Sequence, residues 1–189
     1  MKLFGRRGIA RRYRENQEAA KGFDTYIYGQ TKAPVASLRY GSAGKELRDV
    51  GCGIAAVYNV MRFLGQPQPV ADVINDAELL RLAFMGGRFG TKTKKLDRYF
   101  KLHGVPCQIY RRCSDFKQAL DSHSIAIVCT WNNKITDGIH FYCLYRDSET
   151  GGLTALNYYS ADAPQTFLLD NLRDDRFIIG YGFNTNNKI

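Results

Sequence analysis

The sequence predicts an α+β fold in which helices come first and a mostly antiparallel sheet follows. After Cys52, apolar residues recur at the three-then-four spacing of one helical face as far as Leu64, and Gly65 supplies a stop. Beyond residue 106 the pattern changes to short apolar runs bounded by turn residues, which is typical of strands. Helices followed by strands favour an α+β plan over alternating βαβ units.

Each element has its own local signal. The second helix ends before the glycine-rich segment 85–90, and the third is expected to begin with Thr91 or Thr93 as its N-cap and to end at Gly104. Ser114 is expected to cap a short fourth helix. The predicted helices span residues 52–64, 70–82, 91–103 and 114–120, the predicted strands span residues 107–111, 124–130, 138–146, 153–160 and 177–183, and residues 33–50 are expected to form a loop.

Length and composition indicate one folded domain. A chain of 189 residues with 44% hydrophobic residues can bury its own core. It has no apolar run of about 18 residues, and arginines stand where a signal peptide would need its apolar region, so a cytoplasmic protein is expected. The five cysteines include no CxxC pair, which disfavours a disulfide framework and a structural zinc site. We therefore expect no cofactor and no metal.

Basic residues gather in two places. The net charge is +9, and six Lys and Arg residues precede the first acidic residue, Glu15, so residues 1–22 are interpreted as a basic arm ahead of a single domain over residues 23–189. A second basic group between Arg88 and Lys101 is explained by the solvated face of a helix. A nucleic-acid or anionic-membrane binder acting through the arm is an alternative, although no nucleic-acid motif accompanies the charge.

Cys52 is the first candidate for chemistry. It occupies the first turn of a predicted helix, where free backbone N–H groups and the positive end of the helix dipole favour a thiolate at neutral pH. The flanking Gly51 and Gly53 lack Cβ atoms, so another chain could approach the sulfur closely. A cysteine at a helix start is, by itself, more often a small buried hydrophobe, so a catalytic interpretation requires partners.

The partners come from a predicted hairpin. A four-residue loop after Arg146 pairs that residue with Gly151, and the same register places His140 opposite Asn157. The amide of Asn157 could then hold one imidazole nitrogen and leave the other for the thiol of Cys52. A nucleophile, an imidazole and an orienting amide are the parts of a thiol catalytic group.

Four segments of the chain resemble one enzyme family. They are GCGIAAVYNVMRFLG, GTKTKKLDRYFKLHGV, SIAIVCTW and GIHFYCLYRD. In order and separation they resemble the papain-like cysteine peptidases related to the double-glycine leader-processing peptidase domains of bacteriocin exporters, over roughly residues 45–183. The resemblance implies a papain-like fold, a peptide or protein substrate, and cleavage of a peptide or isopeptide bond. It also implies that Cys52 is the nucleophile, His140 the general base and acid, and Asn157 the orienting residue, where leader peptidases more often have Asp.

One position departs from the family pattern. The family usually places a Gln about six residues before the cysteine, where its amide stabilises the tetrahedral oxyanion, and this chain has Glu46 there. An ionised carboxylate cannot donate a hydrogen bond, so another donor such as Lys45 is required, or activity is weak. A catalytically inactive papain-like module that binds peptides therefore stays open as an alternative to the peptidase.

Overall fold

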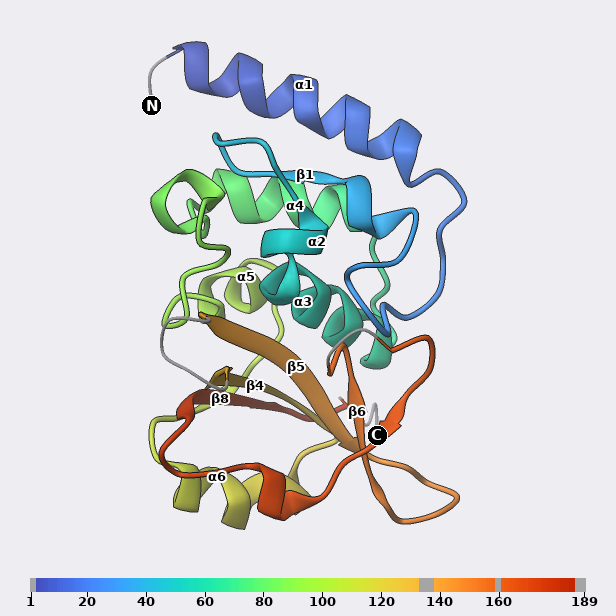
Figure 1. Ribbon diagram of the computed structural model, residues 1–189, viewed down its shortest axis with the longest axis vertical. Helices are drawn as coiled ribbons and strands as arrows, with labels where there is room; N and C mark the ends of the chain where they lie inside the picture. Colours follow the sequence, from blue (N-terminus) through green and yellow to red (C-terminus); the bar gives the residue numbers. More distant parts are fainter. Residues whose placement is uncertain (1–2, 133–137, 159–160, 186–189) are drawn as a thin grey trace.

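The computed structural model describes residues 3–132, 138–158 and 161–185, and it confirms the α+β plan (Figure 1). The helices are α1 (Leu3–Ala19), α2 (Leu47–Val50), α3 (Cys52–Phe63), α4 (Val70–Leu79), α5 (Asp97–Leu102) and α6 (Cys113–Ala119). The strands are β1 (Arg39–Tyr40), β2 (Lys45–Glu46), β3 (Gln108–Tyr110), β4 (Ile125–Trp131), β5 (Ile139–Arg146), β6 (Leu153–Leu156), β7 (Gln165–Thr166) and β8 (Phe177–Phe183).

The main sheet is antiparallel and lies between two sets of helices. Its strand order is β3-β8-β4-β5-β6-β7. Figure 1 shows α3, α4 and α5 on one side of this sheet and α6 on the other. Side chains alternate along β5: Phe141 and Cys143 belong to the buried cluster that includes α3, whereas Tyr142 and Leu144 belong to the cluster that includes α6. The sheet is therefore covered on both faces.

The helix that begins at Cys52 is the best-predicted element. α3 covers Cys52–Phe63, and its residues 52–61 are all buried between the sheet and α4. Such a helix is held by tertiary packing on several sides, and its nearly continuous apolar sequence reflects that position. α4 also follows its prediction, although it ends at Leu79 because the next residues turn back and Arg81 adopts a φ of 56°.

The third and fourth predicted helices begin at different residues from those expected. α5 starts at Asp97, because Thr91 forms an isolated β-bridge with Ala83 and the next N–H, of Lys92, donates to the carbonyl of Leu82 at 2.8 Å. These long-range bonds keep the segment before α5 out of the helix. α6 begins at Cys113 with Arg112 as its N-cap, so Ser114 lies inside the helix and does not cap it.

Two loop and strand boundaries also differ. The predicted loop over residues 33–50 contains the β1–β2 hairpin and α2, and the N–H of Leu47 donates to the carbonyl of Leu38 at 2.8 Å. β6 ends at Leu156, short of the predicted strand end. The last two residues of that prediction, 159–160, lie outside the described residues.

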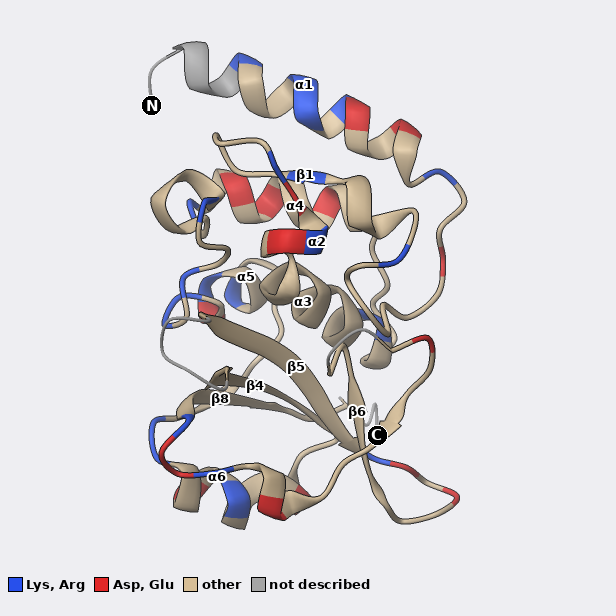
Figure 2. Ribbon diagram, in the orientation of Figure 1, with Lys and Arg blue, Asp and Glu red and all other residues tan. Residues whose placement is uncertain are grey.

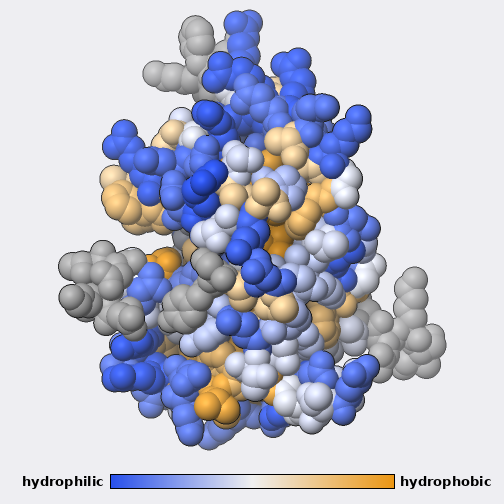
Figure 3. Space-filling model, turned by 45° about the vertical axis from the view of Figure 1, so that its right-hand side comes forward, coloured by the Kyte–Doolittle hydropathy of each residue, from blue (hydrophilic) through white to orange (hydrophobic). Residues whose placement is uncertain are grey.

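The basic N-terminal helix packs on an acidic one. Figure 2 shows Lys and Arg along α1 and acidic residues on α4 beneath it. Arg12 binds both carboxylate oxygens of Glu78, at 3.0 and 2.8 Å, and the hydroxyl of Tyr13 donates to Asp72 at 2.8 Å. The view in Figure 3 has mostly hydrophilic side chains at the top, where α1 lies. No helix among the described residues has the length and apolar character needed to cross a membrane.

Candidate active site

The thiol of Cys52 lies at the N-terminus of α3, close to β5. The residue is 8% exposed and belongs to the buried cluster between α3 and the sheet. Burial raises the pKa of the Cys52 thiol, and the backbone N–H groups of Phe141, Gly53 and Cys52 itself lower it by smaller amounts. Because burial dominates, the resting group at neutral pH is a thiol. The thiolate expected from the helix position alone is not the resting state.

His140 lies at the start of β5 with its ring beside that of Tyr142, at 6.1 Å between centroids and 20° between planes. Its Nε2 hydrogen-bonds to the backbone carbonyl of Asn157 at 2.5 Å. Since a carbonyl can only accept, Nε2 carries the proton and Nδ1 is the basic nitrogen. Burial lowers the pKa of His140, and the bond to Asn157 raises it by a smaller amount. The imidazole is therefore neutral at pH 7.

The hairpin that follows β5 has a different register from the predicted one. Arg146 pairs with Leu153 and not with Gly151. The turn is longer because the carboxylate of Asp147 accepts backbone N–H groups inside it, at 3.1 and 2.9 Å, and delays the return strand. This displacement by two residues moves Asn157 away from the position opposite the histidine.

Asn157 reaches the imidazole through its backbone and not through its amide. Its φ is 56°, in the left-handed region that Asn tolerates. The side-chain Oδ1 accepts the N–H of Gln30 at 2.9 Å, and Nδ2 donates to the carbonyl of Phe141 at 3.1 Å. The Nε2 group of Gln30 donates in turn to the carbonyls of Leu47 and Arg48, at 3.1 Å each. Asn157 thus connects the start of β5, through Gln30, to the segment that precedes α3.

The three predicted catalytic residues converge on the main chain of Phe141. Its N–H faces the Cys52 thiol, and its carbonyl accepts the hydrogen bond from Asn157. His140 is the preceding residue in the chain. The sulfur and the imidazole-bearing residue are therefore neighbours through a single peptide unit, even though the imidazole hydrogen-bonds to Asn157.

The position expected to stabilise an oxyanion is occupied differently. The carboxylate of Glu46 forms an ion pair with Arg48 at 2.8 Å, and Lys45 is exposed on β2. Neither Glu46 nor Lys45 is among the described residues that line the cavity beside Cys52. The amide that the family pattern supplies has no equivalent in these two residues.

The glycines on either side of Cys52 allow close packing within the chain itself. A Cβ atom on Gly53 would lie 2.6 Å from Cβ of Thr91, and one on Gly51 would lie 2.5 Å from the carbonyl oxygen of Leu47. The space that we expected a substrate to use beside the sulfur is therefore partly filled by Thr91.

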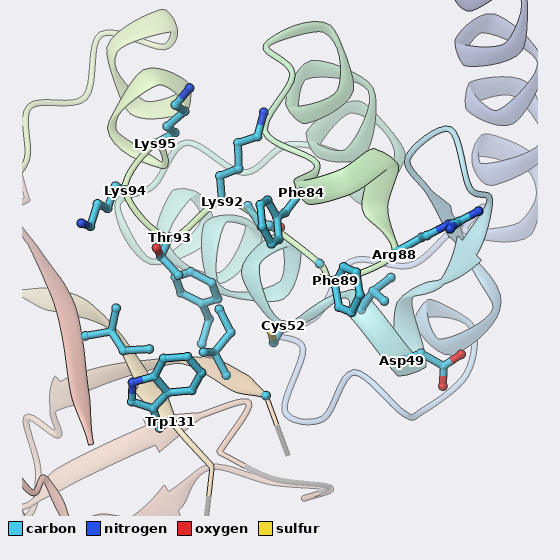
Figure 4. Close-up of a pocket in the computed structure, with 17 residues that line it drawn as sticks. Asp49, Cys52, Phe84, Arg88, Phe89, Lys92, Thr93, Lys94, Lys95 and Trp131 are labelled. Carbon is cyan, nitrogen blue, oxygen red and sulfur yellow. The ribbon is translucent and has the colours of Figure 1, made fainter. Parts of the chain in front are cut away.

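A cavity of about 710 Å³ opens beside Cys52 (Figure 4). Three parts of the chain line it: the α2–α3 junction with Asp49, the segment of residues 84–95, and the ends of β4, β5 and β8 with Trp131, Phe141 and Ile178. The volume lies in the range of small-ligand pockets and suits a few residues of a peptide. The described residues contain no cluster of His, Cys, Asp or Glu that could hold a metal ion.

The basic group around residue 90 was interpreted incorrectly from the sequence. Arg88, Lys92, Lys94 and Lys95 precede α5 and line the cavity, so they do not belong to the solvated face of a helix. The sequence signal that could have identified them is Gly90, because a glycine between Arg88 and Lys92 favours a turn over a helix start. In the structure its φ is 72°.

Comparisons with known proteins give no further guide to the site. No protein-family description matches the chain, and no curated protein is similar to it.

Proposed function

We propose that this chain is a papain-like cysteine peptidase or amidase in which Cys52 attacks the carbonyl carbon of a peptide or isopeptide bond. The observation that carries the proposal is the position of the thiol. Cys52 begins α3, lines the cavity, and faces the N–H of the residue that follows His140. A nucleophile at a helix N-terminus, beside a cavity and an imidazole-bearing strand, is the arrangement that acyl transfer requires.

In the proposed reaction the resting groups are a neutral thiol and a neutral imidazole. As the sulfur forms its bond to the carbonyl carbon, the S–H proton passes to Nδ1 of His140. The carbon–nitrogen bond then breaks as the imidazolium returns the proton to the leaving amine, and water hydrolyses the thioester. The backbone N–H groups at the start of α3 are the donors nearest to the developing oxyanion.

This reaction requires Nδ1 of His140 to come within hydrogen-bonding distance of the sulfur. The sulfur lies next to the N–H of Phe141, in the peptide unit that joins Phe141 to His140. Catalytic hydrogen bonds are often long or poorly aligned before substrate binds. The bond from Nε2 to the Asn157 carbonyl fixes the tautomer that leaves Nδ1 as the base.

The second candidate is a papain-like module that binds peptides without cleaving them. Two observations favour it: Glu46 is paired with Arg48 and offers no oxyanion donor, and the amide of Asn157 is engaged by Gln30 and Phe141. A missing oxyanion donor typically lowers the rate by about a hundredfold to a thousandfold.

The test is cleavage of a diverse peptide mixture, followed by mass spectrometry of the new termini. The wild-type chain is compared with Cys52→Ala, which removes the sulfur and keeps the cavity. The peptidase predicts new termini that are absent with Cys52→Ala. Identical peptide patterns for the two proteins, together with retained peptide binding, would establish the inactive module.

A second readout is alkylation by iodoacetamide at pH 7, with each cysteine followed separately. Cys107 is the internal control, since it is half-buried and burial raises the pKa of its thiol to about 11. A working pair predicts that His140→Ala slows alkylation of Cys52 and leaves Cys107 unchanged. An equal effect on both thiols, or none on Cys52, would remove the general base from the proposal.

A further inference from the structure

Two aromatic walls face each other across the cavity beside Cys52. Phe84 and Phe89 form one wall, with ring centroids 6.2 Å apart, and Trp131 at the end of β4 stands on the other. These side chains are 47%, 61% and 36% exposed, respectively. Figure 4 shows Cys52 between the two walls. Large aromatic surfaces left exposed together in a cavity indicate a site for an apolar group.

The turn that carries Phe84 and Phe89 is held in place by the rest of the chain. The N–H of Phe84 donates to the carbonyl of Gly90 at 2.8 Å, and the carbonyl of Gly86 accepts the N–H of Ala43 at 2.9 Å. The packing is so close that a Cβ atom on Gly41 would lie 2.2 Å from the Gly86 carbonyl oxygen. The aromatic wall is therefore preorganised, which lowers the entropy cost of binding.

A group of lysines continues from this wall toward α5. Lys94 and Lys95 form no ion pair with any carboxylate of the described residues, while the ammonium of Lys92 donates to the carbonyl of Arg81 at 2.8 Å. The backbone between Lys92 and Lys94 is fixed because the Tyr181 hydroxyl donates to the carbonyl of Thr93 at 2.5 Å.

Charge is distributed unevenly along the cavity. Asp49 and Arg88 lie on one side of the view in Figure 4, and Lys94 and Lys95 lie on the other. Asp49 is the acidic side chain among the described lining residues. One end of the cavity therefore carries both signs of charge, whereas at the lysine end Lys94 and Lys95 have no ion-pair partner among the described residues.

We propose that this cavity selects a peptide segment in which a bulky apolar residue stands next to an acidic one. The apolar side chain lies between the aromatic walls, and the carboxylate reaches Lys94 and Lys95. The inference rests on the proposed function, since the segment is the one presented to Cys52. A nucleic-acid strand is disfavoured because its phosphates would also meet Asp49, at the other end of the cavity.

Binding is measured with the Cys52→Ala protein, so that cleavage does not interfere. The probes are fluorescein-labelled hexapeptides that differ only at their two central residues: Glu-Phe, Gln-Phe, Lys-Phe and Glu-Ala. We expect Glu-Phe to bind about two- to thirtyfold more tightly than Gln-Phe, which is the range of two solvent-exposed charge contacts, and the preference to weaken at high salt. Glu-Ala should bind more weakly than Glu-Phe because it leaves the aromatic walls uncovered.

Charge-reversal variants test whether Lys94 and Lys95 cause the preference for an acidic residue. In the Cys52→Ala background, the double variant Lys94→Glu and Lys95→Glu should abolish or invert the preference for Glu-Phe over Lys-Phe. The matched control is Lys101→Glu, an exposed reversal on α5 outside the cavity lining, which should leave the preference unchanged. An equal change in both proteins would mean a diffuse charge effect and would overturn the inference.

The outcomes separate this inference from the proposed function. Selective binding of Glu-Phe without cleavage by the wild-type chain would keep the inference and remove the peptidase. Cleavage that depends on Cys52 but ignores the Glu-Phe pair would do the reverse. A single-stranded oligonucleotide that displaces Glu-Phe at lower concentration than unlabelled peptide would overturn the inference in favour of nucleic-acid binding.

Discussion

Two buried asparagines hold neighbouring parts of one segment from different elements. Asn59, inside α3, binds both the N–H and the carbonyl of Ile27 at 2.8 Å each. Asn157, just beyond β6, binds the N–H of Gln30 and the carbonyl of Phe141. The direction in which the Asn59 side chain points is set by its position in α3. The direction of the Asn157 side chain depends on the length of the turn between β5 and β6 and on the positive φ of Asn157. The bonds of Asn157 therefore depend on contacts outside its own element, which its local sequence does not indicate.

The largest expected effect tests the helix side of this comparison. Cys52→Ala should reduce hydrolysis to the background rate, because Cys52 is the proposed nucleophile. The fold should survive, since removing one sulfur from the first helical turn leaves the rest of the core in place. Peptide cleavage and far-ultraviolet circular dichroism measure the two results. Unfolding of Cys52→Ala would instead mean that the cysteine serves only the core.

His140→Ala tests the strand side and should lower turnover to a comparable degree, because the members of such a unit act together and their effects do not add. The double variant with Cys52→Ala should therefore be no slower than either single variant. Turnover is measured as kcat under saturating peptide. Full activity in His140→Ala would require a different base.

Asn157→Asp separates the predicted role of this residue from the observed one. If the side chain of Asn157 oriented the imidazole, as predicted, Asn157→Asp would retain activity, because a carboxylate also accepts an imidazole N–H. In the observed geometry the carboxylate faces the Phe141 carbonyl and cannot donate to it, so we expect at least about a tenfold loss of activity and a lower melting temperature. Asn157→Gly is the matched control, since it keeps the backbone carbonyl and tolerates a φ of 56°. Wild-type activity and an unchanged melting temperature in Asn157→Asp would contradict the observed bond from the Asn157 amide to the Phe141 carbonyl.

Asn59→Ala should lower the free energy of unfolding by about 2–4 kcal/mol, because the N–H and the carbonyl of Ile27 both lose a buried partner. Urea unfolding followed by tryptophan fluorescence measures the change. Gln66→Ala, at an exposed position after α3, should change stability by less than about 0.5 kcal/mol. Equal effects of the two substitutions would show that the Ile27 bonds contribute little.

The smallest expected effect is a dependence of stability on pH. Burial lowers the pKa of His140 and of His123 in the folded chain. The unfolded chain then binds more protons below about pH 6.5, so stability is complete above that pH and falls as the pH decreases toward the folded values. We expect a loss on the order of 1 kcal/mol between pH 7.5 and pH 5.5, reduced in His140→Gln.

Urea midpoints at the two pH values test this dependence. Three surface carboxylates have a pKa lowered from the usual 3.8, so they stay ionised and do not change stability between pH 7.5 and pH 5.5. They are Asp24, Asp147 and Asp175. A pH dependence that is identical in wild type and His140→Gln would contradict the buried neutral imidazole.

The sequence by itself determined the elements whose signals are local. The spacing of apolar residues predicted five elements, because a buried helix or strand carries apolar residues at the period of its own geometry. These elements are α3, α4, β4, β5 and β8. The position of Cys52 at the start of α3 was determined in the same way.

Tertiary structure decided the features that depend on distant partners. The Thr91–Ala83 bridge delays α5 and places the lysines at the cavity, and the Asp147 turn sets the hairpin register. The side-chain oxygen of Asn157 accepts the Gln30 N–H and its backbone carbonyl accepts the His140 ring N–H, at a residue whose φ is 56°. None of these contacts is visible in local spacing, since each joins residues that only the folded chain brings together.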